Sequence, residues 1–355
     1  MIEINKEANE DFETGKFDEA IEAWEEVLAS YGNAEDNPTV MNCLNNLACA
    51  YGEIGNFQKK LALLERSRKM VERVYGVDHP QYGMVLYNIA CAKEAIGDYA
   101  EMKRLLLEAK EINAKRFHHK HAKVARVLLE LSTAHGHLGE VKEQLAVAEE
   151  AFEIIKKHCG AQHVQTSLAM LNLAKACRAN ELYERQLQLA LSAYDIQEKK
   201  LGAVNPQIAL TLLQLSDAYR MNKDYYNQKD LLERAINLQQ RAFGSRHANL
   251  IDSYLSLAEA YKNLDDVNSE IQYYMEAMKL AKKCYQGQHI MLATTATHAA
   301  HGYILMGNLA KARESLEEAK VILDANKITQ EHRGRKDWER VMAELEEAEK
   351  SAASS

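Results

Sequence analysis

The sequence is poor in proline, glycine and aromatic residues for its length. Its 355 residues include 3 prolines and 16 glycines, and 7% of the side chains are aromatic. β-Sandwiches and loop-rich folds need many turn-forming residues, so this composition argues against both. Leu, Ala, Glu, Lys and Gln dominate instead, and these residues lose least on entering a helix. The composition therefore predicts an all-α protein.

Three further absences narrow the function. No apolar run approaches the roughly 20 residues of a membrane span, and the first residues lack the apolar core of a secretory signal. We therefore expect no membrane association and a cytoplasmic location. The six cysteines form no CxxC pair, which is typical of small core residues in a reducing compartment. The net charge of −8 predicts no nucleic-acid partner, because such binding normally needs a basic surface.

What the chain does contain is a 42-residue period. One column at this step holds histidine or asparagine: Asn37, His79, His121, His163, Asn205, His247 and His289. A second column holds small residues: Ala48, Ala90, Ser132, Ala174, Ser216, Ala258 and Ala300. Seven residues further on lies a third column: Gly55, Gly97, Gly139, Glu181, Lys223, Asp265 and Gly307. Each unit is thus expected to be a first helix, a tight turn near the third column and a longer second helix. Since no such unit can bury its apolar face alone, the units must stack into a solenoid.

The spacing of small, glycine and aromatic residues, as in Ala48, Gly55 and Phe57, resembles the tetratricopeptide repeat. The 42-residue length and the G-x-D-H-P loop at 76–80 are similar to the kinesin-light-chain subclass of that family. The resemblance implies an all-α, right-handed superhelical solenoid of about eight helical hairpins. The array is expected over residues 1–325, with units near 3–36, 38–79, 80–121, 122–163, 164–205, 206–247, 248–289 and 290–325.

Residues 326–355 are expected to form a capping helix and a short tail. Trp338, Val341 and Leu345 share one face of this helix, which is typical of a segment that covers the last open core of a repeat array. The alternative is that Trp338 anchors a partner or a second copy of the chain.

The histidine column is interpreted as a joint between repeats. His79 precedes Pro80 as Asn37 precedes Pro38, and proline is favoured at the first position of a helix. Asparagine just before it is a good helix cap, so we expect His79 to accept an amide hydrogen bond at the start of the next helix.

The resemblance places ligand binding on a concave groove lined by the first helix of each unit. The column two residues before the small residue is polar throughout: Asn46, Asn88, Glu130, Asn172, Gln214, Ser256 and His298. Amides offer a donor and an acceptor together, which suits the backbone of an extended peptide. The alternative is a ladder of hydrogen bonds between adjacent repeats.

Charged residues are expected beside this column. The middle repeats supply Arg126, Lys175, Arg178 and Arg220, and later repeats supply Asp252. Such patches could steer an acidic peptide segment to the middle of the groove and a basic one toward its C-terminal half. The alternative is that these charges pair across adjacent repeats.

No motif for catalysis or cofactor binding is found. There is no phosphate-binding glycine loop and no G-x-S-x-G elbow. His298 and His301 are three residues apart on one helix and are expected to face the groove together, but a third metal ligand is not evident nearby. We therefore expect no enzyme activity, no metal and no cofactor.

The sequence thus predicts a non-enzymatic scaffold or adaptor that binds peptide segments of a protein partner in its groove. Three alternatives stay open: a structural component of a large cytoskeletal or ciliary assembly, a kinesin-light-chain-like cargo adaptor, and a sensor whose superhelix changes pitch on binding a small peptide. The identity of the partner and the oligomeric state are not predicted.

Overall fold

The computed structural model describes residues 2–32 and 37–353, and within these ranges it contains seventeen helices and no strand. The helices are α1 (Ile2–Glu13), α2 (Phe17–Tyr31), α3 (Pro38–Glu53), α4 (Phe57–Tyr75), α5 (Pro80–Ile96), α6 (Tyr99–Phe117), α7 (Ala122–His137), α8 (Val141–Cys159), α9 (Val164–Ala179), α10 (Tyr183–Leu201), α11 (Ile208–Met221), α12 (Tyr225–Phe243), α13 (Leu250–Asn263), α14 (Val267–Cys284), α15 (Ile290–Leu305), α16 (Leu309–Ala325) and α17 (Arg333–Ala353). Residues 33–36 of the first expected unit and residues 354–355 of the expected tail lie outside the described residues.

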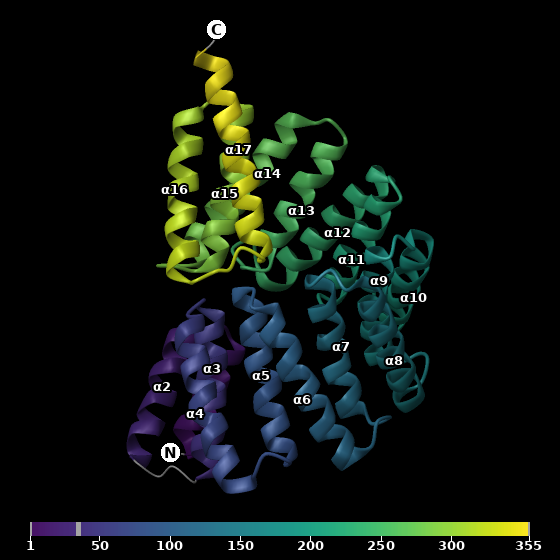
Figure 1. Ribbon diagram of the computed structural model, residues 1–355. Helices are drawn as coiled ribbons and strands as arrows, with labels where there is room; N and C mark the ends of the chain where they lie inside the picture. The colour runs from purple at the N-terminus through teal and green to yellow at the C-terminus, as the bar shows by residue number, and fades with distance from the viewer. Residues whose placement is uncertain (1, 33–36, 354–355) are drawn as a thin grey trace.

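Consecutive helices pair into hairpins because each unit places small residues where two helices meet. Ala48, Ala90 and Ala258 are fully buried, and so are Ala109 and Ala277 on the second helices. Side chains of this size let the two backbones approach closely, and the larger apolar residues fill the remaining space between units. Every hairpin then packs on the next, which produces the all-α superhelical solenoid expected from the sequence (Figure 1).

The tight turns inside the hairpins share one backbone conformation. Gly55 and Gly97 have φ of +76° and +82°, in the left-handed region that favours glycine. Glu181, Lys223 and Asp265 occupy the same column without being glycine, with φ of +59°, +60° and +59°.

The joints between hairpins confirm the capping prediction. The Nδ1 atom of His79 accepts a hydrogen bond from the backbone N–H of Gln81 at 3.2 Å, and Asn37 accepts from Thr39 at 2.8 Å. His121, His163 and His289 cap α7, α9 and α15 in the same way. In each of these contacts the backbone N–H is the donor, so the Nδ1 atom of the ring serves as the acceptor.

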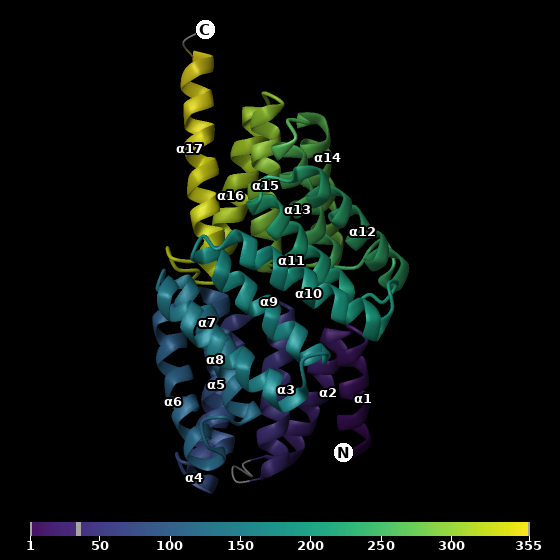
Figure 2. The same cartoon turned by 90° about the vertical axis from the view of Figure 1, so that its right-hand side faces the viewer.

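The superhelix closes on itself, so that its N-terminal part meets its C-terminal part. Figure 1 shows α2 to α6 in the lower half of the molecule and α13 to α17 above them, and Figure 2 shows the same stacking from the side. The Nε2–H of His289 donates to the carbonyl oxygen of Glu53 at 3.1 Å, across 236 residues of sequence. The backbone N–H of Thr329 donates to Ile96 at 3.2 Å, and its hydroxyl donates to the Gly97 carbonyl at 3.0 Å.

Apolar side chains fill the same contact. Phe57 and Ile96, at the ends of two early helices, belong to one buried cluster with Leu292 and Ile328. The turn between α3 and α4 and the turn between α5 and α6 therefore pack against the last two hairpins, α13–α14 and α15–α16, and the connection that follows them.

Helix α17 covers the end of the array. Val341 and Leu345 are fully buried in a cluster with Leu316 of α16 and Ala300 of α15, and the Trp338 indole donates to the Leu316 carbonyl at 2.8 Å. The three residues that the sequence placed on one face thus pack against the last hairpin.

Candidate functional site

The polar column of the N-terminal half forms hydrogen bonds between adjacent first helices. The Asn88 amide donates to Asn45 at 2.5 Å, and Asn172 donates to the Leu129 carbonyl at 3.3 Å. Asn46 likewise donates to Asn9 on α1 at 3.3 Å. These contacts are those of the ladder alternative, and each uses one N–H of an amide that would otherwise be open to a peptide.

Arg126 and Glu130 both contact Tyr87 of the preceding first helix. The Arg126 guanidinium lies 4.7 Å from the centre of the Tyr87 ring, and the Tyr87 hydroxyl donates to the Glu130 carboxylate at 3.3 Å. Burial raises the pKa of Glu130, and the nearby Glu94 carboxylate adds to this effect. The arginine is therefore engaged in packing between repeats.

The basic residues of the middle repeats are mostly paired. Asp217 of α11 bridges Arg178 of α9 at 3.2 Å and Arg220 of its own helix at 2.6 Å. Arg220 also lies 3.9 Å from Glu259 of α13. Charges on three successive first helices thus compensate one another. Lys175 is exposed and has no ion-pair partner among the described residues.

The predicted residues of the later repeats meet at a hollow of about 700 Å³, which we call the C-terminal hollow. It lies between α13, α15 and α17. Its polar lining comprises Asp252, Ser256, Glu259, Lys262 and Asn263 of α13, Tyr274 of α14, Thr294 and His298 of α15, His332 just before α17, and Arg333, Asp337 and Arg340 of α17. Of the twelve groove residues expected from the sequence, Asp252, Ser256 and His298 line this hollow, whereas Gln214 lines neither this hollow nor the smaller one described below.

His298 is held against an aromatic wall of the C-terminal hollow. Its ring stacks on Tyr274 of α14, with ring centres 5.3 Å apart. Burial lowers the pKa of His298 to about 4; Asp337 opposes this effect, while Arg333, Arg340 and His301 add to it. His298 is consequently neutral at pH 7 and offers one donor and one acceptor.

His301 does not share this position, which corrects the expectation that both histidines face the groove. Its ring is buried, and Nδ1 lies 2.7 Å from Glu344 of α17. Its Nε2 lies 3.2 Å from the Lys262 ammonium and 3.3 Å from Glu270 of α14. Residues three apart lie on the same side of a helix, with about 60° between them. In this structure that offset leaves His298 at the hollow, whereas His301 packs against side chains of α13, α14 and α17.

The α17 residues of the hollow were missed by the sequence reasoning. Arg333, Asp337 and Arg340 were assigned to a capping helix alone, because the 42-residue pattern ends before them. In the structure α17 takes the place that a further first helix would have, so its free face continues the groove. Arg333 and Arg340 both approach Asp337, at 3.5 Å and 4.0 Å.

Asp252 differs from the other carboxylates of the hollow. It has no hydrogen-bond or ion-pair partner among the residues that the structure describes. Although its side chain remains accessible to solvent, the walls around it desolvate the carboxyl group and raise its pKa, and Arg333 opposes this shift. An isolated carboxylate in such a place is available to a cation from outside the chain.

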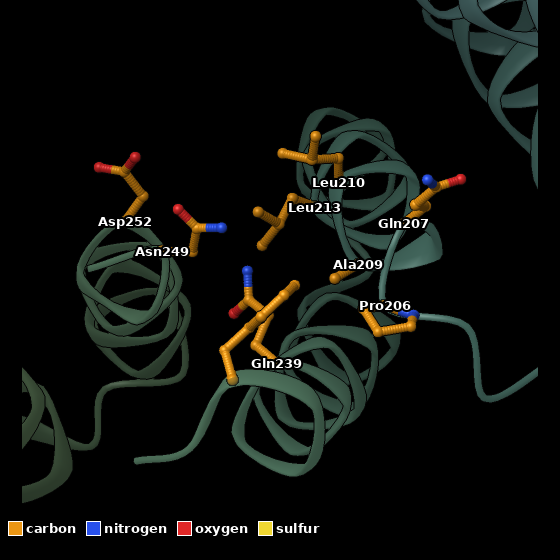
Figure 3. A pocket seen from close by; sticks show the side chains of 9 residues that line it. Pro206, Gln207, Ala209, Leu210, Leu213, Gln239, Asn249 and Asp252 are labelled. Carbon is orange, nitrogen blue, oxygen red and sulfur yellow. The ribbon is translucent and has the colours of Figure 1, made fainter. Parts of the chain in front are cut away.

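A second, smaller hollow adjoins the first at Asp252. We call it the apolar hollow; it measures about 290 Å³ and lies between α11, α12 and α13 (Figure 3). Its apolar lining comes from Pro206, from Ala209, Leu210 and Leu213 of α11 and from Phe243 of α12. Gln207, Gln239, Asn249 and Asp252 are its polar residues. Leu210 is 68% exposed, which is unusual for a leucine on a helix of a packed array.

The arrangement has the character of a binding surface. In residues 2–32 and 37–353, no group of three or more His, Cys, Asp and Glu side chains could hold a metal ion. None of the helices described is long and apolar enough to cross a membrane. The chemistry offered is that of hydrogen bonding, ion pairing and apolar contact.

Comparison with known families identifies the repeats. Three models of the tetratricopeptide repeat match residues 40–81 and 124–165, residues 207–283, and residues 85–116. Together they cover more than half of the chain. No curated protein matches the sequence.

Solved structures show the same fold. A repeat protein of Podosopora anserina assigned as a kinesin light chain, with nearly identical TPR-like repeats, is 25% identical over 57% of this chain and 96% of its own, with a TM-score of 0.50. A Rap protein complexed with Competence and Sporulation Factor is 12% identical over 99% of this chain and 98% of its own, with a TM-score of 0.58. The quorum sensor NprR from B. thuringiensis is 13% identical over 85% of this chain and 82% of its own, with a TM-score of 0.57.

Proposed function

Because the chain belongs to the tetratricopeptide repeat family, with repeats like those of kinesin light chains, we propose that it is a protein-interaction scaffold that binds one extended peptide segment in its C-terminal hollow. The family and its structural neighbours support the scaffold role. The proposal that the peptide binds in the C-terminal hollow is based on the side-chain contacts of the described residues.

The observation that carries the proposal is the contrast between the two halves of the groove. In the N-terminal half, Asn46, Asn88 and Asn172 bond to neighbouring repeats. In the C-terminal hollow, Ser256 and Asp252 have no hydrogen-bond partner among the described residues, and neutral His298 lies beside them. Unpaired donors and acceptors on two successive first helices, α13 and α15, suit a peptide backbone, which offers both at each residue.

The size of the hollow agrees with a short segment. Sites for small ligands measure about 300–1,000 Å³, and the C-terminal hollow, at about 700 Å³, falls within that range. A few residues of an extended chain fill such a volume. The fold itself is compatible with holding a second molecule, since the Rap protein that shares it was solved as a complex.

The proposal is tested by filling the hollow. A library of synthetic octapeptides is screened against the full chain by fluorescence polarisation, and the best binders are titrated against Ser256→Trp. An indole at this position blocks the hollow, so we expect binding to fall by at least tenfold, the loss of about 1.4 kcal/mol of binding free energy.

The matched control is Gln214→Trp. Gln214 occupies the same column one repeat earlier and lines neither hollow, so this variant is expected to bind as the original chain does. Equal binding by Ser256→Trp and the original chain would overturn the proposal, and so would a library from which no peptide binds.

A further inference from the structure

We propose that the bound segment carries a large apolar side chain next to a lysine or arginine, with the apolar side chain in the apolar hollow and the cation on Asp252. This inference rests on the proposed function, since it names the class of peptide that the same groove selects. It follows from how the two hollows meet.

The two hollows are adjacent halves of one site. Asp252 lines both of them, and Leu213 of α11 lies across from it in the apolar hollow (Figure 3). An extended peptide that runs along the first helices therefore passes from one hollow to the other at Asp252. Successive side chains of the peptide would then contact first the leucines of the apolar hollow and next the carboxylate of Asp252.

The apolar hollow fits one side chain. At about 290 Å³ it lies at the lower limit of sites for whole small molecules, so a single aliphatic or aromatic group is the appropriate occupant. Leu210 and Phe243 are 68% and 47% exposed, and an apolar group seated between them would remove this surface from water.

The exposed apolar residues are also periodic. The groove position six residues before each small residue holds Leu168 on α9 and Leu210 on α11, which are 46% and 68% exposed. At the next unit the same position becomes Asp252, and at the following one Thr294. From α9 to α15 this position thus changes from apolar to acidic and then to polar, which gives a peptide in this part of the groove a direction.

The charges around Asp252 favour a cationic side chain of the peptide at this carboxylate. Asp337 is approached by Arg333 and Arg340, and Glu259 is approached by Arg220, so these two carboxylates are already compensated. Asp252 alone among the carboxylates lining the C-terminal hollow lacks such a partner in the described part of the chain. A lysine or arginine of the peptide would supply it and would relieve the cost of leaving the carboxylate partly desolvated.

The test uses a positional-scanning octapeptide library in which two adjacent positions are fixed. We expect the pair of a leucine, methionine or phenylalanine next to a lysine or arginine to bind best. Replacing the peptide lysine by norleucine, which keeps the four side-chain carbons and removes the ammonium group, is expected to weaken binding to the original chain by about tenfold.

Exchanging the charges of Asp252 and of the peptide tests whether Asp252 is the residue that binds the cation. Asp252→Asn should bind the lysine and norleucine peptides equally, and Asp252→Lys should prefer the same peptide with glutamate in place of lysine. Leu210→Ser should lose the preference for the apolar position and keep the preference for the cation. Gln214→Ser, on the same helix and outside both hollows, should change neither preference.

The outcomes separate the two proposals. If Ser256→Trp weakens the binding of the peptides but Asp252→Asn and Asp252→Lys leave their affinities unchanged, this inference is overturned and the proposed function still stands. A library in which acidic peptides bind best would do the same. A dimer in sedimentation that Leu210→Ser converts to monomer would overturn the inference by assigning the apolar hollow to a second copy of the chain.

Discussion

At the residue scale, hydrogen bonding explains why histidine and asparagine occupy the same column of the repeat. The Nδ1 of His79 takes the place of the asparagine side-chain oxygen found at Asn37, because both atoms reach the amide two residues ahead. The ring adds a contact that asparagine lacks, since His79 stacks on Tyr75 with ring centres 4.8 Å apart. Two chemically different side chains therefore serve the same joint.

This equivalence predicts that His79→Asn leaves the free energy of unfolding nearly unchanged. His79→Ala should lose about 1 kcal/mol, the usual effect of removing a helix cap. Chemical denaturation of the two variants measures both values. A large loss in His79→Asn would show that stacking on Tyr75, rather than capping, is the main contribution of the ring.

The turns give a second prediction at the same scale. Glu181, Lys223 and Asp265 hold positive φ where other units have glycine, and this conformation costs a non-glycine residue roughly 1–2 kcal/mol. Glycine loses more chain entropy on folding, so the net gain from each change to glycine should be about 0.5–1 kcal/mol. Thermal denaturation of the triple variant should show a raised midpoint, whereas Glu181→Ala should show no gain.

At the scale of the helix, the pH dependence of α15 can be predicted from His298 and His289. Burial lowers the pKa of His298 to about 4, and it lowers that of His289 as well. An unfolded histidine titrates near pH 6.5, so between about pH 6.5 and pH 4 the unfolded chain binds protons that the folded chain does not. The contribution of these two neutral histidines to stability is therefore complete above about pH 6.5 and falls as the pH is lowered through this range.

The size of the effect follows from the shift. For His298 a difference of about 2.5 pKa units corresponds to about 3 kcal/mol at most. Unfolding by urea at pH 7 and pH 4.5 measures the loss, and His298→Gln should reduce it. His119→Gln, a change at an exposed loop residue, is the control and should retain the original dependence. Equal pH dependence in His298→Gln and the original chain would contradict the assignment.

The sequence predicted the hairpins well because each is determined by local features. Small residues at the helix contact, a turn residue seven positions later and a cap before the next helix all repeat with the same step, so α7 and α8 could be anticipated from α5 and α6. The groove was harder to predict. Asn88 and Asn172 have the right chemistry for a peptide, but each already donates to a neighbouring repeat, and only side-chain geometry shows this.

At the scale of the whole molecule, closure of the superhelix was outside the reach of the repeat pattern. Each hairpin is rotated slightly against the next, and small rotations add up over the array. Whether residue 97 meets residue 329 depends on that sum, and no single unit encodes it. The contact also uses residues that break the pattern, since Thr329 and His332 lie in the connection between α16 and α17.

The closure can be tested by one pair of glycines. Gly97 and Gly139 occupy the same turn in neighbouring hairpins, with φ of +82° and +73°, so replacing either by alanine imposes a similar backbone strain. At Gly139 a new Cβ would meet nothing within 4 Å. At Gly97 it would lie 2.6 Å from the Thr329 hydroxyl oxygen and 2.7 Å from the Cβ of His332.

We therefore expect Gly97→Ala to separate the two ends of the superhelix, and Gly139→Ala to leave them in contact. Gly139→Ala should lose about 1–2 kcal/mol from strain alone, and Gly97→Ala should lose more because the packing of Ile96 against Ile328 is also disturbed. Small-angle X-ray scattering should show a larger radius of gyration for Gly97→Ala than for Gly139→Ala. Identical scattering and identical unfolding free energies in the two variants would mean that the contact between early turns and late hairpins does not hold the superhelix closed in solution.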